Sequence, residues 1–303
     1  MTAQLALGTY RCRAIPEAAV RAAASGARWI DTAPNYATGR AQELLAPALA
    51  ACPSLRIATK AGYFTAATGA DAVNAGVLTE DQAVCGHSLA TEYVRWQIRR
   101  NRAQLGRERL DLVLLHNPER AHPGDRPALH RAIRDAFAVL EEAVAAGHMS
   151  GYGIATWAGL EEEAFTVEKL LALAGEAAGG QHHHLAALQM PVSLVMMTPI
   201  VQALDGRGPL PAAADAGLRV MASAPLHGGE LPTMVDQELA DLIRPGLTPA
   251  QACVLSIASC PGVTDVLLAA SGAPHWREAA DAVAQPILTA AKLREITGVL
   301  ASP

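Results

Sequence analysis

The chain has 303 residues, of which 51% are hydrophobic and 17% charged, with a formal net charge of -5 at pH 7. This composition excludes a disordered chain, and the negative balance provides no basic surface for nucleic acid or an anionic membrane. The longest uncharged runs are broken by glycine, proline or polar residues, and no charged segment followed by an apolar core opens the sequence. We therefore expect a cytoplasmic protein that has neither a nucleic-acid nor a membrane partner.

Short apolar segments alternate with longer helical patterns along the whole chain. Strands that alternate with helices pair in parallel through right-handed crossovers, and eight such units favour a closed barrel over an open sheet. We predict an α/β fold, a (β/α)8 TIM barrel formed as a single domain over residues 1–303. The expected strands are 5–9, 29–32, 55–60, 110–116, 151–156, 186–189, 218–224 and 263–269, and the expected helices are 16–24, 41–51, 92–105, 128–146, 159–173, 211–216, 248–259 and 275–284.

Two longer irregular segments, 61–89 and 196–211, interrupt this alternation. Residues 61–89 are rich in glycine, alanine and aspartate and follow the third expected strand directly. Long loops in compact domains are usually functional, and this one leaves the carboxyl end of a barrel strand. We expect it to form a loop over the active-site mouth.

Ionisable side chains stand at the ends of three consecutive expected strands. Asp31 ends the second strand, with Tyr36 five residues later, Lys60 ends the third and His116 ends the fourth. Barrel enzymes carry their chemistry at this end of the strands. Each residue alone has a structural explanation, as a cap, an edge charge, a buried histidine or a packed ring. Four of them at consecutive strand ends indicate an active site.

These four groups together suit carbonyl reduction. Hydride addition leaves charge on the carbonyl oxygen, so a proton donor is needed there, and the phenol of Tyr36 can serve. An unperturbed phenol has a pKa of about 10, which a nearby ammonium such as that of Lys60 lowers. Asp31 can pair with that ammonium, and His116 can donate to the same oxygen. Lys60 is one of only three lysines, against twenty-one arginines, which makes its position more telling.

The same residues resemble the aldo-keto reductase superfamily, whose pattern is Asp-Thr-Ala-x-x-Tyr, a strand ending in lysine, and an Asp-Leu-x-Leu-x-His strand. The resemblance spans nearly the whole chain and implies a (β/α)8 oxidoreductase with Tyr36 as general acid, Asp31 and Lys60 as its tuning pair and His116 as the orienting group. It also implies NADPH as cofactor, with NADH possible. The cofactor-binding residues then expected are Gly8, Thr9, Tyr10, Asp31, Thr156, Gln189, Ser223, Pro225, Leu226, Gly228, Ser271 and Arg277.

Several positions depart from the superfamily pattern. Ala155-Thr156-Trp157 replaces a Ser-Asn pair that holds the nicotinamide carboxamide, and Ser223 replaces an aromatic residue that stacks on the ring. The segment 269–277 lacks most of the usual residues for a 2′-phosphate. Substrate contacts are expected from residues that follow strand ends, with core packing as the alternative for two of them, Phe64 and Trp157. These expected substrate contacts are Tyr10, Tyr63, Phe64, Asn117 and Trp157.

The sequence therefore predicts an NAD(P)H-dependent oxidoreductase that reduces an aldehyde, ketone or sugar-like carbonyl, or oxidises the matching alcohol. Two alternatives stay open, an isomerase or lyase that uses the same barrel without a nucleotide, and a non-catalytic barrel that binds a nucleotide. No metal is expected, because the five cysteines are widely spaced and His182, His183 and His184 are adjacent in the chain. The sequence alone does not identify the substrate or the oligomeric state.

Overall fold

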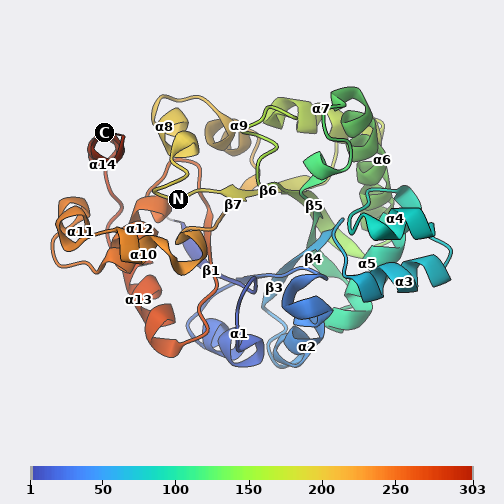
Figure 1. Cartoon of the computed structure of the whole chain (residues 1–303), viewed down its shortest axis with the longest axis horizontal. Coiled ribbons are helices and arrows are strands. Elements are labelled where there is room, and N and C mark those ends of the chain that lie inside the picture. The colour runs from blue at the N-terminus through green and yellow to red at the C-terminus, as the bar shows by residue number, and fades with distance from the viewer. Residues whose placement is uncertain (1–2, 302–303) are drawn as a thin grey trace. The chain divides into compact units, whose positions relative to one another are not determined.

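The structure is a computed structural model that describes residues 3–301. Within these residues eight strands close into a parallel barrel in chain order (Figure 1), so the predicted (β/α)8 fold is confirmed. The strands are β1 (Gln4–Gly8), β2 (Trp29–Asp31), β3 (Arg56–Ala61), β4 (Leu110–His116), β5 (Met149–Ala155), β6 (Leu185–Pro191), β7 (Arg219–Ser223) and β8 (Asp265–Leu268).

Helices follow the strands, and some strands are followed by more than one helix. They are α1 (Ile15–Ala24), α2 (Ala41–Ala51), α3 (Ala66–Asn74), α4 (Glu80–Val84), α5 (Thr91–Leu105), α6 (Arg126–Ala145), α7 (Val167–Ala178), α8 (Thr198–Leu204), α9 (Pro209–Asp215), α10 (Leu231–Met234), α11 (Gln237–Ile243), α12 (Pro249–Ala258), α13 (Ala273–Val283) and α14 (Ala290–Leu300).

The helix expected over 159–173 begins later than predicted. Thr166 is its N-cap, and the Thr166 hydroxyl accepts a hydrogen bond from the Lys169 amide, so α7 starts at Val167. Two other expected boundaries are confirmed. Thr248 caps α12 and forms a capping box with Gln251, and Gly106 ends α5 in the left-handed conformation.

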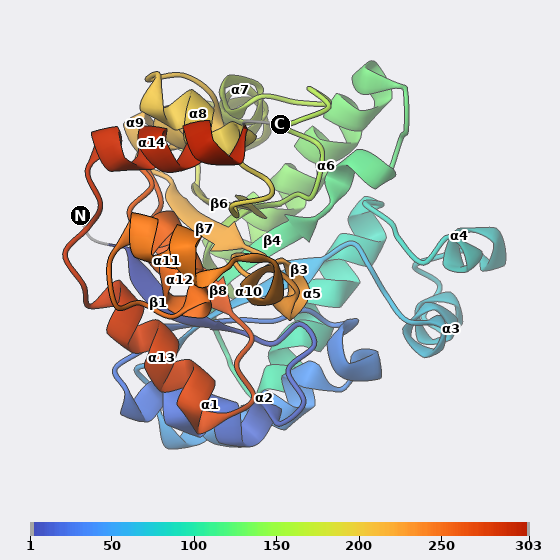
Figure 2. The same ribbon diagram turned by 60° about the vertical axis from the view of Figure 1, so that its left-hand side comes forward.

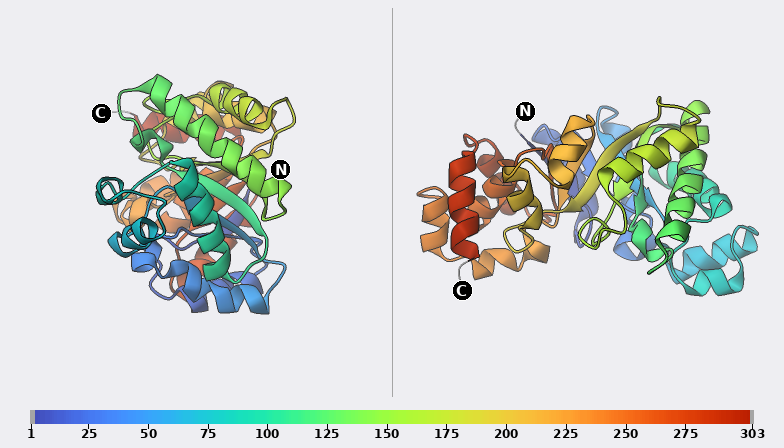
Figure 3. Two further views of the ribbon diagram at one scale, coloured as in Figure 1. Left: turned by 90° about the vertical axis from the view of Figure 1, so that its right-hand side faces the viewer. Right: turned by 90° about the horizontal axis from the view of Figure 1, so that it is seen from above.

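The chain divides into two compact units. Unit 1 comprises Met1–Ala27 with Leu188–Pro303, and unit 2 comprises Arg28–Ala187. In unit 1, α14 packs against α8 (Figures 2 and 3), and the core around α12 joins buried side chains of α10, α11 and α14. In unit 2, α6 packs against both α5 and α7 (Figure 3).

The strand register in unit 2 fixes the expected catalytic residues at one end of the sheet. Asp31 pairs with Ala58, Lys60 with Leu114 and His116 with Ala155 in parallel ladders. These strands are buried almost throughout because a parallel sheet covered by helices hides both faces. Consecutive strand ends therefore bring ionisable groups together in an apolar surrounding.

The segment 61–89 is not the irregular loop that we expected. It contains α3 and α4, which lie side by side (Figure 2), and a short antiparallel neck closes its base. In this neck Tyr63 and His87 form a β-bridge, and Phe64 N donates to Gly86 O at 3.0 Å. Its position over the active-site mouth stays a prediction.

None of the helices within residues 3–301 has the length and apolarity needed to cross a membrane. Among the same residues, no group of three or more histidine, cysteine, aspartate or glutamate side chains is placed to hold a metal ion. The five cysteines are free thiols, and burial raises the pKa of Cys253 and of Cys260 to about 12. Burial thus disfavours the thiolate, the reactive form of cysteine, at both positions.

Candidate active site

A buried ion pair lies at the ends of β2 and β3. Lys60 Nζ donates to Asp31 Oδ1 at 2.7 Å, to Asp31 Oδ2 at 2.8 Å and to Thr32 O at 2.9 Å. The side chains of Lys60 and Asp31 are 1% and 6% exposed. Burial lowers the pKa of Lys60, while the charge of Asp31 and its hydrogen bonds oppose that shift. The Asp31 carboxylate thus stabilises the charged form of Lys60 at a buried position that would otherwise favour the neutral amine.

Tyr36 stands beside this ammonium. It follows β2 at the start of a short 3-10 turn, Tyr36–Gly39, in which Ala37 and Thr38 have φ values of 48° and 58°. Such left-handed backbone is uncommon for residues other than glycine and clusters at functional sites. The turn brings Lys60 Nζ to 4.9 Å from the centroid of the Tyr36 ring. A positive charge at this distance favours the phenolate form of a tyrosine.

His116 completes the group from the end of β4. Its ring lies edge-on to Tyr36, with centroids 5.9 Å apart, and edge-on to Tyr63, with centroids 4.9 Å apart. Burial is the main cause that lowers the pKa of His116 well below 6.5, and the charge of Lys60 adds to it. His116 is therefore neutral at physiological pH.

The position of the His116 proton follows from the hydrogen bonds. Nδ1 is buried and has no hydrogen-bond partner among the described residues. Burying a bare lone pair costs less than burying an N–H without an acceptor, so we assign the proton of the neutral ring to Nε2. The imidazole then presents a donor that can bind an oxygen.

The neck of the 61–89 segment adds a second histidine. His87 Nε2 lies 2.9 Å from the carbonyl oxygen of His116, and the Tyr63 ring packs edge-on against both imidazoles. Burial lowers the pKa of His87 to about 4, so the ring is neutral near neutral pH. Because a carbonyl oxygen can only accept, the single ring proton is assigned to Nε2, which donates to it. The guanidinium of Arg120 lies 5.7 Å from the centroid of the Tyr63 ring. The sequence analysis missed His87, because it is 29 residues from His116 inside a presumed loop.

Glu119 is another residue that the sequence analysis missed. Its Oε1 accepts from Thr156 Oγ1 at 2.9 Å, from Trp157 N at 3.1 Å and from Ala158 N at 3.3 Å. The carboxylate thereby shapes the loop that follows β5. Its second oxygen, Oε2, is buried and has no partner among the described residues. The only signal in the sequence is an acidic residue three positions after a strand-end histidine.

The remaining expected residues of unit 2 fall into different environments. The Thr156 hydroxyl donates to Glu119 and accepts from Gly159 N at 2.9 Å, so its proton is already used. Trp157 is 49% exposed, and Asn117 turns the chain after β4 with a φ of 47°. Phe64 is 6% exposed and packs in a core cluster with Tyr93. Phe64 thus has the core-packing environment that was its alternative interpretation.

In unit 1 the expected cofactor residues are found at strand ends and in the turns after them. Ser271 Oγ accepts from Arg13 N at 2.8 Å, and Arg21 Nη1 donates to Ser271 O at 3.3 Å. Arg13 makes its contact through the backbone amide and Arg21 through its guanidinium. Neither contact was anticipated, whereas the expected cation, Arg277, is exposed on α13. The others are Gly8 at the end of β1, Thr9 (1% exposed), Tyr10 (55% exposed), Gln189 (5% exposed) in β6, Ser223 at the end of β7, and Pro225, Leu226 and Gly228 just beyond it.

The fold and the ionisable cluster define a parallel barrel protein whose strand ends carry a phenol, a paired ammonium and a neutral imidazole. The sequence model of the Aldo/keto reductase family matches residues 10–298, and the chain belongs to this family. Membership implies oxidoreductase activity.

Solved structures show the same fold. An aldo/keto reductase from Klebsiella pneumoniae, solved in complex with NADP and acetate, is similar to this chain with a TM-score of 0.66 and 19% sequence identity. The match covers 99% of this chain and 92% of that chain. The comparison with curated proteins found no match.

Proposed function

We propose that this protein reduces the carbonyl group of an aldehyde, ketone or sugar-like compound with NADPH, or oxidises the matching alcohol. The observation that carries the proposal is the Lys60 ammonium, which is buried against Asp31 and lies 4.9 Å from the centroid of the Tyr36 ring. A structural ion pair has no need of a phenol beside it. Family membership and the NADP bound to the Klebsiella enzyme support the choice of cofactor.

In the proposed reaction Tyr36 donates its proton to the substrate oxygen as the carbonyl becomes an alcohol. The phenolate that remains is stabilised by Lys60, whose own charge is balanced by Asp31. His116, neutral and protonated on Nε2, donates a hydrogen bond to the same oxygen and orients it. Solvent then returns a proton to Tyr36.

The residues present fit a nicotinamide cofactor, which supplies the hydride when bound. A carboxamide carries N–H donors, and Glu119 Oε2 is a buried acceptor without a partner among the described residues. Glu119 thus offers an open acceptor beside Thr156, whose hydroxyl is already engaged. We propose Glu119 and Thr156 as contacts to the cofactor from unit 2. The proposed contacts in unit 1 are Gly8, Thr9, Tyr10, Gln189, Ser223, Pro225, Leu226, Gly228 and Ser271, with the Arg21 guanidinium as a nearby cation.

Purified protein tests this proposal in two steps. NADPH or NADH should show a shift in fluorescence on binding, and a generic reactive aldehyde should then oxidise the bound cofactor. Tyr63, Asn117 and Trp157 are the proposed substrate contacts, so their alanine variants should raise KM for the aldehyde while cofactor binding is kept. Absence of binding by either nucleotide at millimolar concentration would show that the proposal is wrong.

A further inference from the structure

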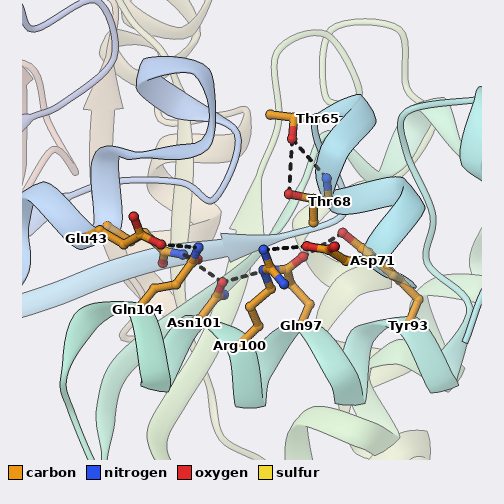
Figure 4. Close-up of polar contacts among 10 residues, drawn as sticks. Glu43, Thr65, Thr68, Asp71, Tyr93, Gln97, Arg100, Asn101 and Gln104 are labelled. Atoms are coloured by element: carbon orange, nitrogen blue, oxygen red, sulfur yellow. Dashed lines mark hydrogen bonds and ion pairs between the residues drawn. The ribbon is translucent and has the colours of Figure 1, made fainter. Parts of the chain in front are cut away.

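Three neutral, buried side chains form a hydrogen-bonded chain along one face of α5, the helix that packs against β3 (Figure 4). Tyr93, Gln97 and Asn101 are spaced four residues apart, so they share a helix face, and each is 0% exposed. Tyr93 Oη donates to Gln97 Oε1 at 2.6 Å, and Gln97 Nε2 donates to Asn101 Oδ1 at 2.7 Å. Burial raises the pKa of Tyr93, so its phenol stays neutral in this network.

The network ends on the backbone of Lys60. Asn101 Nδ2 donates to the carbonyl oxygen of Lys60 at 2.9 Å. The neighbouring residue is held as well, because Thr59 Oγ1 donates to Gln42 Oε1 at 2.7 Å. Gln42, from α2, in turn donates to Asn101 Oδ1 at 3.0 Å and to Gln104 Oε1 at 2.8 Å. Helices α2 and α5 thus hold Thr59 and Lys60, near the end of β3, through one network of side-chain amides.

The orientation of the Asn101 amide is determined by its partners. Its oxygen accepts two N–H groups, from Gln97 and from Gln42, so it cannot be exchanged with the nitrogen without losing both bonds. The nitrogen must then face the Lys60 carbonyl. Directly beyond this point Gly62 turns the chain with a φ of 135°, close to the His116 carbonyl. The peptide carbonyl of Lys60 is thus held by this donor, in addition to the ladder that joins β3 to β4.

Stability alone does not account for such a network. Burying amides is costly unless every group is satisfied, and apolar side chains of similar volume would pack between a helix and a strand at lower cost. A satisfied amide network, however, fixes a single geometry, and these amides place no charge next to the Lys60 ammonium. A rigid neutral support is what a tuned proton donor requires.

We propose that Asn101 is a positioning residue for Lys60, which it holds through the peptide carbonyl so that the ammonium keeps its place between Asp31 and Tyr36. This inference rests on the proposed role of Tyr36 as general acid. Asn101, which lies outside the proposed substrate contacts, would then help to set the acid strength of the Tyr36 phenol. The titratable groups near Tyr36 include Lys60 from β3, Asp31 from β2 and His116 from β4.

The test is an ultraviolet difference titration of the Tyr36 phenol, obtained by subtracting the curve of the Tyr36→Phe variant in each background. Asn101→Asp keeps the acceptors for Gln97 and Gln42 but, once ionised at alkaline pH, cannot donate to the Lys60 carbonyl. We expect the pKa of Tyr36 to rise by about one unit. Gln104→Glu is the matched control, because Gln104 joins the same network through Gln42 and its hydrogen bonds run to Gln42 and Glu43 on α2, away from Lys60.

A second variant covers the case in which the Asn101→Asp protein does not fold. Asn101→Ala removes the donor without adding a charge, and we expect the pKa of Tyr36 to rise here as well. Its kcat should fall roughly tenfold or more with little change in KM, as expected when a reacting group is slightly misplaced. An unchanged Tyr36 titration in the folded Asn101 variants, or an equal rise in Gln104→Glu, would overturn the inference. The titration uses neither cofactor nor substrate, so a lack of turnover with NADPH and aldehyde would contradict the proposed function separately.

Discussion

Lys60 Nζ lies 2.7 Å from Asp31 Oδ1 and 2.8 Å from Asp31 Oδ2, with both side chains almost completely buried. Removing the negative charge by Asp31→Asn leaves an ammonium in the protein interior without its counter-ion. We expect a loss of about 3–5 kcal/mol in the free energy of unfolding, because breaking a buried pair leaves an uncompensated charge. Chemical denaturation near neutral pH measures this loss.

The double variant Asp31→Asn with Lys60→Met is the control. It removes both charges and keeps an apolar chain of similar length, so most of the lost stability should return. If the single variant were as stable as the wild type, the pair would not be holding a charged lysine.

His87 makes the stability depend on pH. Its pKa is about 4 in the folded protein and near 6.5 in the unfolded chain. Between these values the unfolded state takes up a proton that the folded state does not, so stability falls as the pH drops from 6.5 to 4. The loss amounts to roughly 2–3 kcal/mol. His87→Gln retains a donor for the His116 carbonyl, because its amide nitrogen can reach the place of imidazole Nε2. It should show a shallower decline in denaturation experiments across this range. Parallel curves for the two proteins would contradict the shift.

Glu119 should control the loop after β5. Glu119→Ala removes the common acceptor of Thr156 Oγ1, Trp157 N and Ala158 N. We expect the amides of Trp157 and Ala158 to exchange faster with deuterium, and a loss of about 1–3 kcal/mol in stability. Glu119→Gln keeps an acceptor oxygen and should protect these amides nearly as well as the wild type. Equal exchange in all three proteins would show that the loop is held by other contacts.

Gly153 in β5 is required by the close packing of the barrel wall. A Cβ at this position would meet the carbonyl oxygen of Ala187 and come within 2.7 Å of Leu114 Cδ2. Gly153→Ala should therefore cost roughly 3 kcal/mol or more, since backbone atoms cannot move aside easily. Gly147→Ala is the comparison, because its φ of 76° is strained for alanine but nothing lies within 4 Å. That variant should cost about 1 kcal/mol in thermal or chemical denaturation.

The strands and the catalytic candidates could be predicted from the sequence because they form apolar segments that end in ionisable residues. Strand β4 matches the expected range 110–116 residue for residue, and its buried positions, Leu110 and residues 112–115, are all apolar. Ionisable residues at the ends of such runs stand out, and parallel strands with consecutive order bring those ends together. Asp31, Lys60 and His116 could be selected in this way without any knowledge of side-chain directions.

Other parts of the site depend on tertiary contacts that leave no periodic pattern. Helices α3 and α4 are short and are fixed by the caps Thr65 and Thr79 and by packing. Such short helices leave no clear periodic pattern, so we predicted a loop for residues 61–89. Asn101 looks like an ordinary polar residue of an Arg-rich helix until its partners on α2 and β3 are known. For the same reason the Glu119 contacts with the loop after β5 could not be foreseen.

The central claim is that Tyr36 donates the proton to the substrate, and the Tyr36→Phe variant tests it most directly. Its affinity for NADPH, measured by fluorescence titration, should equal that of the wild type, since only a hydroxyl group is removed from the substrate side. Turnover of a reactive aldehyde should fall by at least about a hundredfold, as expected when a general acid is lost. A variant that binds NADPH normally and turns over at the wild-type rate would contradict the account.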